Sequence, residues 1–171
     1  MSTTEEFIAA NALYAASFAR GGLPLPPARR VAVVTCMDAR LLPSRALGLE
    51  EGDAHVIRNA GGLARDALRS LVISQQLLGT REIVVIHHTD CGMLTFTNEH
   101  LQEKVRTELG GDASAIDFQP FSDLERSVAD DVSFLRESPL LLEGVPVRGF
   151  VYDVHSGRLT EVVVPAEATV P

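Results

Sequence analysis

Several features are scarce or missing in this chain of 171 residues, and each absence narrows the class of protein. There is no tryptophan, and no apolar run reaches the roughly 20 residues that a transmembrane helix needs. Residues 1–6 lack the basic and apolar regions of a secretory signal. We therefore expect no membrane association and a location in the cytoplasm.

Basic residues are also few. The chain has 15 Lys and Arg against 23 Asp and Glu, a net charge of -8, which argues against nucleic acid as a partner because such binding depends on neutralising phosphates. Only two cysteines occur, and in a reducing compartment such a pair more often binds metal or takes part in catalysis than forms a disulfide. A hydrophobic content of 46% nevertheless predicts a compact fold.

The N-terminal segment is expected to stand apart from the rest. Apolar residues near helical spacing predict an amphipathic helix from Thr4 to about Phe18. The glycines and prolines between Gly21 and Pro27 cannot continue that helix. We therefore divide the chain into a helical arm with a Pro-rich linker, residues 1–27, and a zinc-binding α/β domain, residues 28–171.

Short apolar runs alternate with helical segments through the second region. The expected strands cover residues 31–34, 54–57, 83–86 and 149–152, and the expected helices cover residues 66–78 and 122–135. Such alternation predicts a single α/β domain with a mostly parallel central sheet flanked by helices. A last run, residues 159–164, predicts an antiparallel C-terminal edge strand.

Two cysteines and a histidine lie where predicted strands stop. Cys36 follows the first strand, and His88 and Cys91 follow the third. Two thiolates and one imidazole are ligands typical of zinc, and three protein ligands leave a fourth position for water, as in catalytic sites. We therefore predict one Zn²⁺ per chain. The alternative is that both cysteines are simply buried, as free cysteines often are.

Two charged residues beside Cys36 predict how that water is assisted. Asp38 and Arg40 are alternate residues of an extended segment and are expected to share a face. Asp38 could accept a hydrogen bond from the nucleophile on zinc, while Arg40 keeps the carboxylate ionised. Asp38 could instead bind zinc as a fourth ligand and close the site. His87 is expected to point to the opposite side of its strand.

Glycines follow the second predicted strand. Ala60, Gly61 and Gly62 allow a tight turn in which the backbone approaches a ligand closely, so we regard them as candidate substrate-binding residues. A plain connection from strand to helix would have a similar composition.

These motifs together resemble the β-class carbonic anhydrases. That family carries a Cys-x-Asp-x-Arg segment, an Arg-Asn-Ala-Gly segment and a His-x-x-Cys-Gly segment. The chain matches them in order over roughly residues 31–94, at Cys36, Asp38 and Arg40, at residues 58–61, and at His88, Cys91 and Gly92.

The resemblance implies a function and a set of roles. Cys36, His88 and Cys91 would be the zinc ligands, Asp38 and Arg40 the catalytic pair, and Gly92 a backbone donor to substrate. The reaction would be reversible hydration of carbon dioxide to bicarbonate by zinc-bound hydroxide, in a homodimer or homotetramer whose N-terminal helix packs on a partner subunit.

The chain also departs from the common family pattern. Leu49, Glu50 and Ile73 replace residues usual in the pocket wall, and His87 replaces a usual glycine. The short length and residues 87–93 resemble a small bacterial branch that is also similar to carbonyl sulfide hydrolases. Hydrolysis of carbonyl sulfide or carbon disulfide by the same zinc hydroxide is therefore the nearest alternative. A zinc protein without catalytic activity, closed by Asp38, is an alternative of another class.

Overall fold

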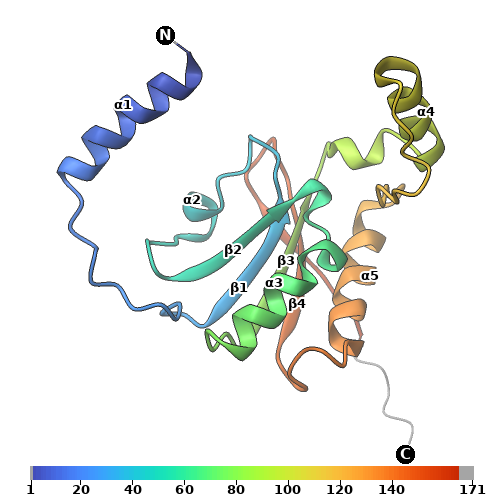
Figure 1. The fold of residues 1–171 in the computed structure, drawn as a ribbon. Helices are drawn as coiled ribbons and strands as arrows, with labels where there is room; N and C mark the ends of the chain where they lie inside the picture. Colours follow the sequence, from blue (N-terminus) through green and yellow to red (C-terminus); the bar gives the residue numbers. More distant parts are fainter. Residues whose placement is uncertain (1, 166–171) are drawn as a thin grey trace, which may run out of the picture.

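The computed structural model describes residues 2–165 (Figure 1). Within that range the sheet contains five strands, and helices precede, connect and flank them. The strands are β1 (Val31–Cys36), β2 (Ala54–Asn59), β3 (Glu82–His88), β4 (Val147–Tyr152) and β5 (Leu159–Val162). The α-helices are α1 (Thr3–Ala16), α2 (Pro43–Leu47), α3 (Ala64–Gln76), α4 (Asn98–Leu109) and α5 (Leu124–Glu137).

The strands lie in the order β2-β1-β3-β4-β5. The first four are parallel, and β5 pairs antiparallel with β4, with Gly149 opposite Val162. The mostly parallel sheet and the antiparallel edge strand are therefore confirmed. Within residues 2–165, no helix has the length and apolar character needed to cross a membrane.

One face of the sheet packs against α3 and α5, which also contact each other. These helices and the strands form the main core, because β-branched residues of buried parallel strands meet the apolar stripes of both helices. Its buried members are Ala32, Val34, Ala64, Ala67, Leu71, Ile83, Val85, Val128, Val132, Leu135 and Val147.

The strand order determines where a ligand can bind. Since β1 lies between β2 and β3, the connections from β1 to β2 and from β2 to β3 run in opposite directions along the sheet. Parallel sheets open a crevice outside the carboxyl ends of their strands at such a reversal. Cys36 ends β1 and His88 ends β3, so both residues lie at this crevice.

Some elements differ from the sequence-based expectations. The helices α2 and α4 were not predicted: α2 has only five residues, and α4 is mostly polar and has no buried residue. The arm helix α1 exists, but its apolar residues are spread around it and none is buried, so the expected single apolar face was wrong. Figure 1 shows α1 standing away from the sheet.

Candidate metal centre

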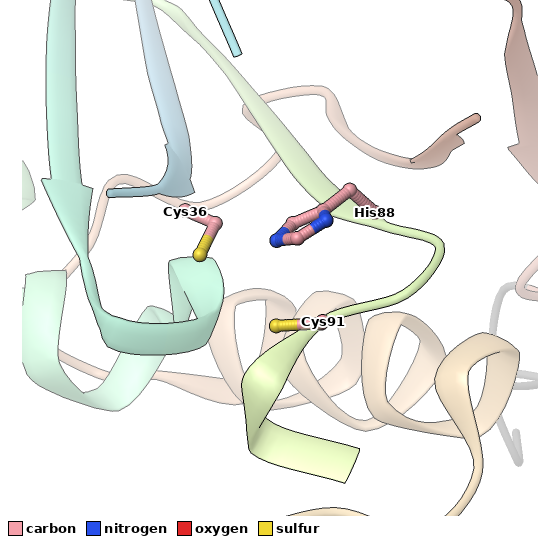
Figure 2. Close-up of side chains that lie close together, drawn as sticks. All are labelled: Cys36, His88 and Cys91. Carbon is pink, nitrogen blue, oxygen red and sulfur yellow. The ribbon is translucent and has the colours of Figure 1, made fainter. Parts of the chain in front are cut away.

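The three predicted ligands come together at the crevice. The ligand atoms of Cys36, His88 and Cys91 lie within 4.8 Å of one another, and their side chains converge in Figure 2. Two of them are held by strand ends, and the third stands just before a short 3-10 turn, η2 (Gly92–Leu94). All three side chains are buried. Two strand ends and the turn before η2 thus bring two sulfur atoms and one imidazole to the spacing of a tetrahedral metal site.

The imidazole of His88 is oriented for a ligand. Its Nδ1 lies 2.8 Å from the carbonyl oxygen of Thr89, which can only accept a hydrogen bond, so Nδ1 carries the hydrogen. Its Nε2 is buried and has no hydrogen-bond partner within residues 2–165. Buried polar atoms rarely lack a partner, and a backbone carbonyl on the other ring nitrogen is the common support of a metal-binding histidine. The unpartnered Nε2 therefore fits a bound metal.

The two thiols differ in acidity. A hydrogen bond from the Cys91 thiol lowers the pKa of Cys36 to about 4, although burial opposes the shift. The same bond raises the pKa of Cys91, and burial raises it further. Burial lowers the pKa of His88, but the attraction of the nearby Cys36 sulfur and the hydrogen bond to Thr89 outweigh it, and the net shift is upward. At neutral pH the cluster therefore carries one thiolate that attracts a divalent cation.

Asp38 and Arg40 pair beside the ligands. The Arg40 Nε donates to Asp38 Oδ1 at 3.0 Å, and Nη2 donates to Oδ2 at 2.8 Å. This bidentate pair holds the pKa of Asp38 well below its usual range. Asp38 Oδ2 lies 3.8 Å from His88 Nε2, so the carboxylate borders the metal position. The predicted pair is present, but the expected extended segment is wrong: residues 38–41 form a turn, with Leu41 donating to the Asp38 carbonyl.

Arg58 holds this turn in place through hydrogen bonds to its backbone. Its Nε donates to the carbonyl oxygen of Cys36 at 3.0 Å, and its Nη2 donates to that of Asp38 at 2.7 Å. One guanidinium therefore fixes the backbone on both sides of Met37. Arg58 belongs to the Arg-Asn-Ala-Gly segment, but its partners could not be identified from sequence spacing.

The three small residues after β2 take different positions. Ala60 and Gly61 line the cavity in front of the ligands, whereas Gly62 does not. Gly62 has a φ of +76°, and a Cβ placed there would lie 2.8 Å from the Cys36 backbone nitrogen. Gly62 therefore lets the turn pack directly behind the end of β1, and its contact is with protein backbone.

A cavity of about 420 Å³ opens in front of Cys36, Cys91 and Gly92. Asp38 supplies the carboxylate in its lining, and most of the wall is apolar. Three aromatic or aliphatic side chains of this wall were not predicted, because they come from α4 and the segments on either side of it: Phe96, Leu101 and Phe118. A cavity of this composition suits a small apolar molecule that meets polar groups at one end.

His87 points away from the metal position, as predicted. Its Nδ1 lies 2.8 Å from Ser127 Oγ and its Nε2 lies 3.1 Å from Asp131 Oδ2, both on α5. Asp131 also accepts from the backbone nitrogen of Ala64, the first residue of α3. This buried network joins β3 to both covering helices, immediately before the ligand His88.

Comparisons with known proteins agree with this geometry. The family model described as carbonic anhydrase matches residues 31–159. Beta-carbonic anhydrase 1 of Mycobacterium tuberculosis H37Rv is 45% identical over 163 residues, covering 95% of this chain and 99% of that protein. A carbon disulfide hydrolase of Acidianus is 35% identical over 160 residues, covering 79% of this chain and 78% of that protein.

A solved structure resembles the whole fold. The crystal structure of carbonic anhydrase from Streptococcus mutans has a TM-score of 0.91 and 52% sequence identity, covering 95% of this chain and 99% of that one. The family model spans most of the chain, including the three ligand positions, the Asp38–Arg40 pair and the sheet that carries them. The chain belongs to the β-carbonic anhydrase family.

Proposed function

We propose that this protein catalyses the reversible hydration of carbon dioxide to bicarbonate. One observation carries the proposal: a buried Cys-His-Cys cluster with an unpartnered imidazole nitrogen stands at the end of an apolar cavity, beside an ionised carboxylate. Carbon dioxide is small and apolar, whereas bicarbonate is charged, so the site must offer an apolar entrance and polar groups at its base. Relatives and a solved neighbour named carbonic anhydrases support this assignment.

We propose zinc as the cofactor, one ion per chain, held by Cys36, His88 and Cys91. Thiolate and imidazole ligands favour zinc over hard cations such as magnesium and calcium. When bound, zinc acidifies a water molecule and so supplies a nucleophile near neutral pH. A reducing compartment keeps Cys36 and Cys91 from forming disulfides and so available to zinc, which supports our proposal of a cytoplasmic location.

The protein's own groups would orient the reactants. Asp38, kept ionised by Arg40, accepts a hydrogen bond from the attacking oxygen and directs its lone pair toward the carbon. The apolar wall limits competing water and receives carbon dioxide. We assign the backbones of Ala60, Gly61 and Gly92 to substrate binding, because these residues line the cavity beside the ligands.

Stopped-flow carbon dioxide hydration by zinc-loaded protein tests this function. Cys91→Ser should lose both zinc and activity. Asp38→Ala and Arg40→Ala should keep zinc but lower turnover by at least about tenfold, because each disrupts a positioned acceptor. Glu161→Gln, which breaks a similar exposed carboxylate–arginine pair with Arg148, should leave turnover unchanged. A zinc-loaded wild type without hydration activity would refute the proposal.

A carbon disulfide or carbonyl sulfide hydrolase is the second candidate. The wide apolar cavity accommodates a heavier congener, and a 35% identical relative is named carbon disulfide hydrolase. Turnover of all three gases by the same preparation would separate the two activities. Inactivity toward all three, with zinc bound, would favour a non-catalytic site closed by Asp38.

We also propose that the protein assembles as a homodimer or homotetramer. No residue of α1 is buried, and Phe7, Ile8 and Leu13 are among its exposed side chains. A helix with this much apolar surface is stable in water when another surface covers it. A second copy of the chain supplies such a surface symmetrically. Light scattering should give at least twice the mass of one chain, and an active monomer would contradict the assembly.

A further inference from the structure

Arg40 binds two aspartates, and the second is not part of the pair described above. Its Nη1 donates to Asp90 Oδ2 at 2.6 Å, and its Nη2 donates to the Asp90 carbonyl oxygen at 2.9 Å. Arg40 therefore grips Asp38 with one edge of its guanidinium and Asp90 with the other. Because different hydrogens serve the two sides, the contacts do not compete for donors.

Asp90 links the segments that follow the two ligand-bearing strands, β1 and β3. It immediately precedes Cys91, whereas Arg40 lies four residues after Cys36. Its φ of +54° places it in the left-handed region, which aspartate tolerates better than most residues. This backbone conformation presents both the carboxylate and the carbonyl oxygen of Asp90 to the same arginine.

The grip is needed because Arg40 is a long and partly exposed side chain, 44% exposed. Such a side chain loses much rotamer freedom when it binds one partner. A second anchor holds the guanidinium in place before Asp38 binds, so less entropy is lost in forming the pair. Asp38 then remains on Arg40, although its carboxylate lies close enough to the ligand cluster to reach a metal.

We propose that Asp90 is a positioning residue that holds Arg40 in place and thereby keeps Asp38 from occupying the fourth metal position. The inference rests on the proposed function, since it concerns access to that position.

The experiment measures anion binding to cobalt-substituted protein. Azide binds at the fourth position and changes the visible spectrum of Co²⁺, whereas Asp38 at that position excludes it. Asp90→Gly deletes the carboxylate and keeps the positive φ and the carbonyl oxygen. In this variant Asp38 should occupy the fourth metal position in more of the molecules, so fewer molecules can bind azide. The apparent azide Kd should therefore rise, by up to about fivefold, which corresponds to the free energy of a partly exposed ion pair.

Four further variants complete the design. Asp90→Asn keeps an acceptor and tolerates a positive φ, so its azide Kd should stay near that of the wild type. Asp38→Ala removes the competing carboxylate, so adding Asp90→Gly to it should change nothing. Glu161→Gln is the remote control, and metal content should be equal throughout.

Other results would overturn the proposal. An unchanged or lower azide Kd in Asp90→Gly would show that Asp90 does not keep Asp38 away from the fourth metal position. An equal loss of affinity with and without Asp38 would show that Asp90 acts on the loop itself. These readouts need no turnover, so a wild type inactive toward carbon dioxide would refute the proposed function and leave this inference standing or failing on the spectra alone.

Discussion

Cys36 and Cys91 hold protons with very different strength, although both would serve the same ion. The pKa of Cys36 is lowered to about 4 and that of Cys91 is raised, since one sulfur donates to the other. Zinc binds thiolates, so it must displace the proton that Cys91 keeps at neutral pH. Any His88 that is protonated, given its raised pKa, must lose a proton as well.

We therefore expect zinc binding to release at least one proton at neutral pH, and the apparent zinc affinity to rise with pH. Calorimetry in buffers of different ionisation enthalpy measures the release, and chelator competition between about pH 6 and 8 measures the affinity. Cys91→Ser should lose this dependence together with most of the affinity. A zinc affinity independent of pH would contradict the assigned protonation.

Arg58 is a second residue whose effect should reach the metal. It donates to two carbonyl oxygens of the segment that carries Cys36 and Asp38. Arg58→Lys offers one ammonium where a planar fork spans two acceptors, so it should not restore the wild type. We expect Arg58→Ala to lower the free energy of unfolding by about 1–2 kcal/mol and to weaken zinc binding.

Denaturant unfolding and chelator competition measure the two effects of Arg58→Ala. Arg126→Ala is the control, because its partner Asp130 is 3.7 Å away and both side chains are exposed. Equal results for these two alanine variants would show that Arg58 does not stabilise the metal site.

The turn between β2 and α3 depends on a glycine behind the metal centre. A Cβ on Gly62 would lie 2.8 Å from the Cys36 nitrogen and 2.9 Å from the Thr35 carbonyl carbon, with φ at +76°. Gly62→Ala therefore adds crowding to an unfavourable backbone conformation. We expect a loss of about 2–4 kcal/mol in unfolding free energy and weaker zinc binding.

Gly157→Ala separates the effect of crowding from that of the positive φ. Gly157 has a similar φ of +71°, but its nearest neighbour, Tyr152 Oη, would lie 3.7 Å away. It should cost only about 1–2 kcal/mol and leave zinc binding unchanged. Denaturant unfolding with zinc titration checks both. If Gly157→Ala were as harmful as Gly62→Ala, the close approach to β1 would not be the cause.

At the scale of the elements, the sequence predicts whatever depends on local pattern. The apolar runs locate the strands, and their carboxyl ends locate Cys36 and His88, because parallel strands bring such ends together. The helix α4 is not predicted because its sequence is mostly polar and none of its residues is buried. Phe96 and Phe118 of the cavity wall lie on either side of this helix and were missed with it. The roles of Asp90 and Arg58 were also not predicted, since the residues they bind lie 50 and 20 positions away in the sequence.

At the scale of the whole molecule, the helix α1 is not packed against the rest of the described chain: none of its residues is buried. The helix α1 touches the rest through Tyr14, whose hydroxyl donates to Glu51, and the following segment adds an ion pair between Arg20 and Glu50. Both contacts are exposed, and exposed pairs contribute little to stability. The arm is therefore held mainly by what covers its apolar side chains in the assembly.

The assembly can be tested through one side chain on that arm. Leu13 is 78% exposed, and burying a leucine at an interface contributes about 1.5–3 kcal/mol. We expect Leu13→Glu to raise the dimer Kd by at least about tenfold, because a buried unpaired charge costs further free energy. Leu109→Glu is the control: Leu109 ends α4 and is 79% exposed, and its substitution should leave the mass unchanged. Light scattering across a dilution series measures both. If Leu109→Glu dissociated the assembly and Leu13→Glu did not, the interface would lie at α4 and not at the arm. If neither variant dissociated it, the proposal that a partner subunit covers the apolar side chains of the arm would be wrong.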